Sequence, residues 1–167
     1  MPGARRTYLM ILLGAATWCG LILAPPLFAA SGEPALAALL YGFFRPICHQ
    51  IDGRSLHLFG LPLAVCARCS AIYIGFLGGT LAYPFFRDPP IPGRAFIAVA
   101  LLPMLLSVGA GMLGVNDGGN AGRVVTGGWF GLLIPFLLIP GAIEGVAQLS
   151  ASSSTPSIQP EKGSTDA

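Results

Sequence analysis

The sequence predicts an all-α, polytopic membrane protein with about four transmembrane helices, a short interfacial helix and a disordered C-terminal tail. Of its 167 residues, 54% are hydrophobic and only 10% are charged, whereas soluble domains carry roughly 25% charged residues. Four stretches are apolar enough and long enough to cross a bilayer. Backbone at that depth must satisfy its own hydrogen bonds, so we expect each stretch to be a helix.

The four spans are expected at about residues 7–28, 66–86, 95–115 and 124–143. A crossing takes about 20 apolar residues, because a helix rises 1.5 Å per residue across a core of about 30 Å. The first span follows Arg5 and Arg6 and resembles a signal peptide, with small residues at positions 29–31. Its apolar stretch exceeds the roughly 7–15 residues typical of a signal peptide, so we expect it to be retained.

Small residues and prolines recur within the spans. Glycines at such spacings let helix backbones approach closely, and we expect packing from Gly75, Gly78, Gly79, Gly127, Gly128 and Gly131. Prolines inside spans are tolerated where neighbouring groups satisfy the freed carbonyls, and this applies to Pro103, Pro135 and Pro140. These residues are predicted to pack helices and to perform no chemistry.

Two segments are not predicted to cross the membrane. Residues 35–47 are apolar but too short, so they are predicted to form an interfacial or re-entrant helix that ends at Pro46. Residues 150–167 are rich in serine, threonine and proline, which predicts a disordered tail. The membrane domain should therefore occupy residues 1–149.

Charge gives a weak indication of orientation and partners. Five basic residues fall on the side of the termini and four on the other, and two of those four, Arg54 and Arg68, lie close to cysteines. The positive-inside bias then places both termini in the cytoplasm and the cysteine loop outside. The net charge of +2 and the absence of a basic run exclude nucleic acid as a partner. The expected partner is the lipid bilayer, and the glycine-rich spans would permit a homo-oligomer.

Three of the four cysteines are concentrated between residues 48 and 69. Cys66 and Cys69 would share one face of the first turn of the second span, and Cys48 and His49 approach from the other end of the connection. Zinc favours thiolate and imidazole ligands in a tetrahedral set. The pattern predicts a structural, zinc-like site on Cys48, His49, Cys66 and Cys69, with His57 as substitute ligand and Arg54 and Arg68 offsetting the thiolate charge.

Two other interpretations of the cysteines stay open. A C-x-x-C at a helix N-terminus has a lowered thiol pKa, so Cys66 and Cys69 would suit a membrane thiol-disulfide oxidoreductase. Such enzymes relay electrons through a second cysteine pair, and here only Cys19 remains, in the middle of the first span. The other interpretation is a structural disulfide from Cys48 to Cys66 or Cys69, in an accessory or transport subunit. No residue is assigned a catalytic role, and whether the protein is an enzyme stays undecided.

A second polar segment, residues 115–123, joins the last two spans and should face the same side as the cysteines. Asn116 and Gly118 are typical turn residues. A carboxylate at a membrane face usually finds a partner, so Asp117 is expected either to pair with an arginine or to be a solvated turn acid. The predicted polar cluster contains Arg54, Arg68, Asp117, Asn120 and Arg123.

The order of these motifs resembles a known family. C-H-Q at residues 48–50 is followed by R-S at 54–55, C-A-R-C at 66–69 and Y-x-G at 73–75. Together with Asp117, Asn120, Arg123 and Thr126-Gly127, this series is similar to the domain of unknown function 2085 family of small prokaryotic membrane proteins. The resemblance covers about residues 41–131. It implies no reaction, only that these polar residues belong to one site.

Overall fold

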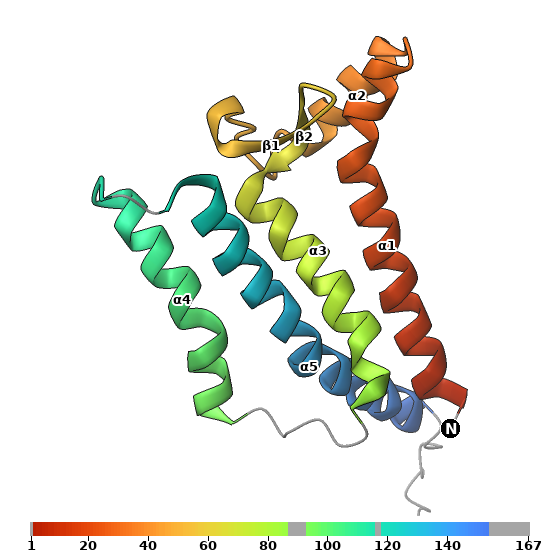
Figure 1. Cartoon of the computed structure of the whole chain (residues 1–167). Coiled ribbons are helices and arrows are strands. Elements are labelled where there is room, and N and C mark those ends of the chain that lie inside the picture. The colour runs from red at the N-terminus through yellow and green to blue at the C-terminus, as the bar shows by residue number, and fades with distance from the viewer. Residues whose placement is uncertain (1, 87–92, 116–117, 154–167) are drawn as a thin grey trace, which may run out of the picture.

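The computed structural model describes residues 2–86, 93–115 and 118–153. The chain is mainly helical, as predicted (Figure 1). Its elements, in chain order, are α1 (Pro2–Ala30), α2 (Pro34–Phe44), the 3-10 turn η1 (Asp52–Arg54), β1 (Ser55–Leu58), β2 (Leu61–Cys66), α3 (Ala67–Ala82), the 3-10 turn η2 (Tyr83–Phe85), α4 (Arg94–Met112) and α5 (Gly119–Ser153).

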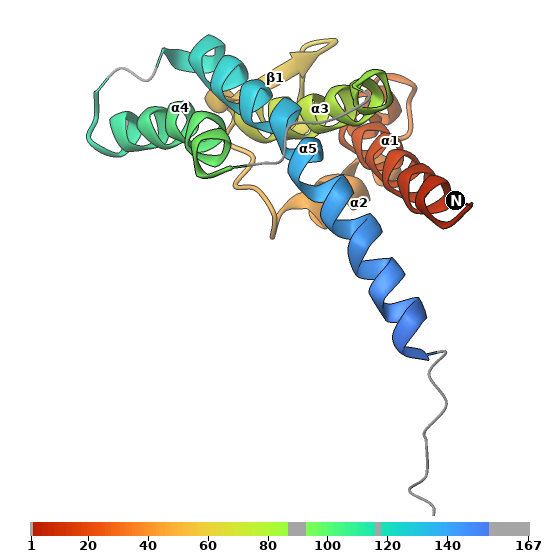
Figure 2. The ribbon, with the colours of Figure 1, turned by 90° about the horizontal axis from the view of Figure 1, so that it is seen from below.

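Helices α3 and α5 form the centre of a helical bundle. Helix α1 packs along α3, and α4 packs along α5 on the opposite side (Figures 1 and 2). Many apolar side chains on the outside of the bundle are exposed, for example Leu13 at 66% and Leu106 at 64%. Soluble proteins rarely leave apolar patches of that extent uncovered, and a bilayer would cover them.

Among the residues that the structure describes, three helices are long and apolar enough to cross a membrane: α1, α4 and α5. The second predicted span, at about residues 66–86, is shorter than expected. Helix α3 begins directly after Cys66, as predicted, but has 16 residues, which extend about 24 Å at 1.5 Å per residue. A hydrocarbon core is about 30 Å thick. Helix α3 is thus shorter than the hydrocarbon core is thick. The reason is that the apolar run starting at residue 61 is divided between strand β2 and helix α3.

Glycines bring α3 and α5 into backbone contact, as predicted. A Cβ added to Gly75 would lie 2.6 Å from the carbonyl oxygen of Gly128, and one added to Gly127 would lie 2.7 Å from that of Arg68. At Gly79 and Gly131 an added Cβ would overlap the carbonyl oxygens of Leu132 and Ile72. Gly78 and Gly128 differ, because an added Cβ would make ordinary contact there, 3.8 Å from Leu132 Cδ1 and 3.9 Å from the Ala71 carbonyl oxygen.

A β-hairpin, β1 and β2, was not predicted, so the expectation of an all-α chain was incomplete. The two strands pair antiparallel, with Leu58 opposite Leu61 and Ser55 opposite Cys66. The turn residues Phe59 and Gly60 both have positive φ, 56° and 76°. That combination is the one required by a tight two-residue hairpin turn.

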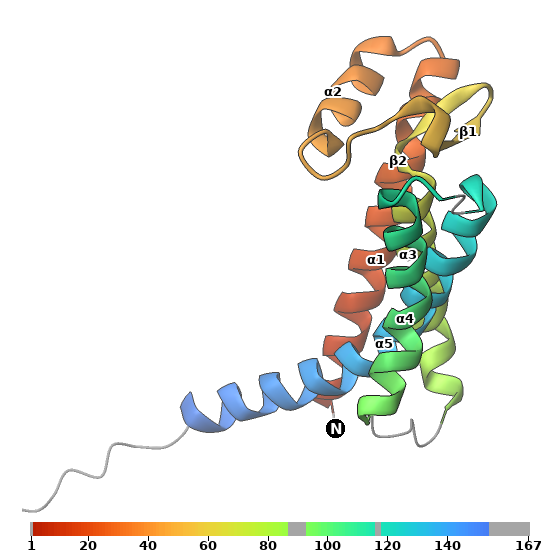
Figure 3. The same cartoon turned by 90° about the vertical axis from the view of Figure 1, so that its left-hand side faces the viewer.

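The two polar segments lie at the same end of the bundle, as predicted. Asn120 Nδ2, at the start of α5, donates a hydrogen bond to the carbonyl oxygen of Ser55 in β1, at 3.3 Å. The N-terminus of α1 lies at the opposite end, and the C-terminal part of α5 turns away from the bundle there (Figure 3). Pro135 and Pro140 lie inside α5, and prolines commonly cause such bends.

The last helix is longer than predicted. It extends ten residues beyond the expected end of the fourth span at residue 143 and includes residues 150–153, which were assigned to the tail. The rest of the predicted tail, residues 154–167, lies outside the described residues. Helix α2 is close to its expected range and lies beside α1 at the hairpin end (Figures 1 and 3).

Candidate metal centre

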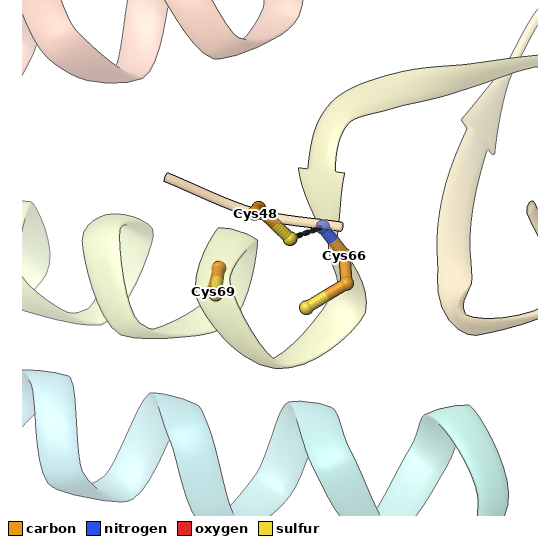
Figure 4. Close-up of side chains that lie close together, drawn as sticks. All are labelled: Cys48, Cys66 and Cys69. Carbon is orange, nitrogen blue, oxygen red and sulfur yellow. Dashed lines mark hydrogen bonds between the residues drawn. The ribbon is translucent and has the colours of Figure 1, made fainter. Parts of the chain in front are cut away.

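Three thiols meet where the hairpin joins the bundle. The sulfur atoms of Cys48, Cys66 and Cys69 all lie within 4.8 Å of one another (Figure 4). None of the three forms a disulfide. Cys66 is both the last residue of β2 and the residue that precedes α3, and Cys69 lies in the first turn of that helix. The C-x-x-C motif therefore occupies a helix N-terminus, as predicted.

Cys48 is brought to this pair by the irregular segment that follows α2. The amide of Gln50 donates two hydrogen bonds, to the carbonyl oxygens of Tyr41 and Ala64, both at 2.8 Å. Gln50 has a positive φ of 49°, a conformation that costs energy for a residue other than glycine and that the surrounding contacts must hold. The two bonds tie the segment to both α2 and β2. Gln50 therefore holds Cys48 beside Cys66.

The cluster rests on the apolar core of this end of the molecule. Phe44 and Val65 are completely buried, and Cys48 itself is 8% exposed. Trp18 of α1 packs on Phe44 and on Tyr73, with ring centroids 5.3 and 5.8 Å apart. Water is therefore excluded from one side of the thiols.

The surroundings of Cys66 favour its thiolate. The neighbouring Cys69 thiol lowers the pKa of Cys66 below its usual range, and the backbone amides of Cys69 and Arg68 act in the same direction. Burial acts in the opposite direction but is outweighed. The Cys66 backbone N–H donates to the sulfur of Cys48 at 3.2 Å. An N–H bond to sulfur stabilises negative charge on that sulfur.

On the other side of the thiols, the structure is open. A cavity of about 460 Å³ is lined by all three thiols and by polar residues from the hairpin segment, α3 and α5. The polar lining residues are His49, Gln50, Arg54, Arg68 and Arg123. The thiol cluster is thus covered by apolar side chains on one side and faces an accessible cavity lined by arginines on the other.

The two histidines are placed differently from the thiols. His49 is exposed and lines the cavity, but it is not part of the group of converging ligand atoms. His57 lies in β1, where its Nε2 is 2.9 Å from Asp52 Oδ1 at the surface. The structure therefore brings together the three predicted cysteine ligands but not His49. The predicted substitute ligand, His57, lies away from the cluster.

The second polar segment joins the cavity through α5. Arg123 donates to Asn120 Oδ1 at 3.1 Å, and Arg68 donates to Ser107 Oγ of α4 at 3.0 Å. Both arginines line the cavity, as does exposed Arg54. Asp117 lies outside the described residues, so its expected pairing with an arginine remains a prediction.

Several positioning residues were missed in the sequence. Ser55 is buried, and its hydroxyl donates to the Ile51 carbonyl at 2.9 Å while its own carbonyl accepts the Asn120 bond. Gln50 and Ser55 belong to the C-H-Q and R-S motifs, so the motif order already pointed to them. Cys19 is buried in α1 and its thiol donates to the Tyr73 carbonyl at 3.4 Å, so it packs α1 against α3.

Comparisons with known proteins agree with the predicted resemblance. The family model described as "Predicted membrane protein (DUF2085)" matches residues 48–137. These residues begin at Cys48 and include the cluster, the cavity arginines and the glycine contacts of α3 with α5. The chain is also similar to the uncharacterised protein MJ1492 of Methanocaldococcus jannaschii, at 33% identity over 144 residues, covering 81% of this chain and 92% of that protein. No solved structure matches the chain.

Proposed function

The chain belongs to the DUF2085 family of predicted membrane proteins, and we propose that it binds one zinc-like metal ion through Cys48, Cys66 and Cys69. The convergence of the three sulfurs carries this proposal. They come from two segments, 18 positions apart at Cys48 and Cys66, yet lie within 4.8 Å of one another. In a tetrahedral zinc site with Zn–S bonds of about 2.3 Å, sulfurs are about 3.8 Å apart. Small side-chain adjustments would close that difference.

The chemistry of the surroundings also supports a metal. A cysteine that ligates a metal does so as a thiolate, and the pKa of Cys66 is lowered in this direction. The N–H bond to Cys48 Sγ is of the kind that orients a metal-ligating atom and tunes its affinity for the ion. Three thiolates on a divalent ion carry a net negative charge, which the cavity arginines would offset.

The open cavity favours a site with an exchangeable fourth ligand. Zinc sites with a structural role are usually closed by four protein ligands, whereas sites that act on a ligand keep one position open. His49 lies outside the thiol group and is exposed. We therefore place the fourth position towards the cavity, with His49 as the competing fourth ligand of a closed structural site.

Metal analysis of the detergent-purified protein tests the proposal. We expect about one equivalent per chain, lost in Cys66→Ser and Cys69→Ser and retained in Cys19→Ser, because Cys19 is a thiol outside the cluster. In His49→Ala the metal should also be retained. Cobalt substitution would then report the number of sulfur ligands through its thiolate charge-transfer absorption. An absence of metal from folded protein, even after zinc is supplied, would refute the proposal.

A second candidate function is thiol-disulfide exchange. The lowered pKa of Cys66 and the closeness of Cys69 favour it. The Cys66 thiolate would attack a substrate disulfide to form a mixed disulfide, and Cys69 would then release the reduced substrate and leave a Cys66–Cys69 disulfide. Thiol trapping in cells distinguishes the candidates. A bond that cycles supports exchange, a fixed Cys48 bridge supports a structural disulfide, and reduced metal-bound thiols support the metal site.

We also propose that the lipid bilayer surrounds the bundle, with both termini in the cytoplasm and the thiol cluster outside. The exposed apolar side chains of α1 and α4 support the first part, and the positive-inside count supports the second. Labelling of single cysteines introduced at Phe59 and Gly3 with a membrane-impermeant reagent tests the orientation. In intact cells, only the position at Phe59 should react.

A further inference from the structure

The three thiols leave one position of a tetrahedral metal ion uncovered. A zinc site with three cysteines is ordinarily completed by a fourth cysteine or a histidine. In the part of the chain that the structure describes, no such residue joins the converging sulfurs. Cys19 is buried in α1, where its thiol bonds to the Tyr73 carbonyl, and His57 is paired with Asp52 at the surface. Apart from exposed His49, which competes for the position, the described chain offers no fourth ligand of either type.

The space beside this position is the cavity of about 460 Å³. Cavities of roughly 300–1,000 Å³ are typical of sites for small molecules. All three thiols line it, so a molecule inside it reaches the sulfurs directly. Part of the wall is apolar: Ile47 and Ile51 flank the C-H-Q motif, and Val108 and Met112 belong to α4. The cavity therefore has room for a ligand from outside the chain, next to the open position.

The thiolates decide which outside ligand suits the ion. A zinc ion with neutral ligands is a strong Lewis acid and makes its bound water acidic. Three thiolates give the site a net negative charge, so the ion attracts water and other oxygen ligands less strongly. Sulfur is a soft ligand and matches the three sulfurs already present. Zinc with four thiolates is a common closed tetrahedral site in proteins. A fourth sulfur is therefore the favoured ligand.

We propose that a small thiol compound binds in this cavity as a thiolate, at the fourth position of the metal ion. The inference deepens the proposed metal site and rests on it. On binding, the thiol gives its proton to solvent, its sulfur forms a bond to the metal, and the water molecule that held the position leaves. The bound sulfur is then ionised, and ionised sulfur is the reactive form of a thiol. The site would thus activate small thiols.

The cobalt-substituted full chain in detergent tests the inference, with mercaptoethanol and ethylene glycol as probes. The two probes are uncharged and similar in size, and they differ only in that sulfur replaces one oxygen. The charged residues around the cavity therefore favour neither. We expect mercaptoethanol to raise the thiolate charge-transfer absorption by about one third, because four sulfur ligands replace three. Ethylene glycol should leave that absorption unchanged.

A substitution in the cavity wall tests where the thiol binds. Val108→Phe fills part of the cavity from α4. It should weaken mercaptoethanol binding at least about tenfold, because the added ring overfills the site, while the metal is retained. Leu106→Phe is the matched control, since Leu106 lies on the same helix, is 64% exposed and does not line the cavity. Leu106→Phe and His49→Ala should both bind the thiol as the unchanged protein does.

The outcomes separate this inference from the metal site. An absence of metal refutes the metal site, and this inference with it. Bound metal with no spectral response to mercaptoethanol, an equal response to ethylene glycol, or unchanged thiol binding in Val108→Phe refutes only this inference. Loss of cobalt on addition of the thiol does the same, because the thiol then removes the ion. Much tighter thiol binding in His49→Ala would also overturn it, by showing that His49 occupies the fourth position.

Discussion

The middle of the bundle and its hairpin end are held together by different means. Between α3 and α5, glycines allow backbone to touch backbone. At the hairpin end, Gln50, Ser55 and Asn120 tie irregular segments together through hydrogen bonds to backbone carbonyls. The first region depends on the absence of side-chain atoms, and the second on their placement. Fold stability and site geometry should therefore respond to different substitutions.

The largest effect is expected in the middle of the bundle. Gly131→Ala would place a methyl group against the carbonyl of Ile72, and because backbone cannot yield as a side chain can, we expect a loss of about 3 kcal/mol of stability. Gly78→Ala, where an added Cβ has room, is the control. Unfolding in a mixed-detergent titration measures both. Equal effects of the two substitutions would mean that close backbone contact does not hold this interface.

Gln50→Asn should mainly damage the hairpin end. Asparagine tolerates positive φ and keeps the amide, but its shorter side chain cannot reach both the Tyr41 and Ala64 carbonyls. Each unsatisfied carbonyl costs roughly 1–3 kcal/mol. Since Cys48 then loses its anchor, metal affinity should fall roughly 10–100-fold, as for other supporting residues. Competition with a chromophoric chelator measures this affinity, with Gln148→Asn, at an exposed position near the end of α5, as control. An unchanged metal affinity in Gln50→Asn would mean that Gln50 does not hold Cys48 in the site.

The pH response of Cys66 gives an intermediate test. Because its folded pKa is lowered, its contribution to the stability of the metal-free protein is complete above the usual thiol pKa of about 8.5. That contribution is lost as pH falls through the lowered value. Alkylation of Cys66 should therefore reach its half-maximal rate below the usual pH. Cys69→Ala should move that midpoint upward, since Cys69 is the main cause, and Cys48→Ala should move it less. No shift in Cys69→Ala would contradict this assignment.

The smallest effect is expected for Asn120→Ala. This substitution removes the neutral bond to the Ser55 carbonyl, which is worth about 1 kcal/mol, and the acceptor that Arg123 uses. The hairpin should exchange amide hydrogens faster while the α3–α5 interface stays protected. Thr7→Ala at the opposite end removes a single exposed hydroxyl bond and serves as control. Faster exchange in both regions would show that they are not separate.

The same contrast explains how much could be predicted from the sequence. Spans, glycine contacts and the C-x-x-C at a helix start follow from local composition and spacing. The hairpin could not be predicted, because β2 and α3 follow each other without a break and form one largely apolar stretch of sequence. The position of His49 and the role of Gln50 could not be predicted, because they depend on a positive φ and on bonds between residues 9 and 14 positions apart. Contacts between segments far apart in the chain leave no recognisable pattern in the local sequence.

Cys66 belongs to two structures at once, as the last residue of the hairpin and the first residue before α3. The hairpin therefore cannot swing relative to the bundle without carrying one sulfur away from the other two. A force applied at the exposed hairpin tip near Phe59 would therefore change the distances between the three sulfurs. A metal ion bound by them would in turn make the hairpin more rigid. The junction makes the hairpin and the cluster a single mechanical unit.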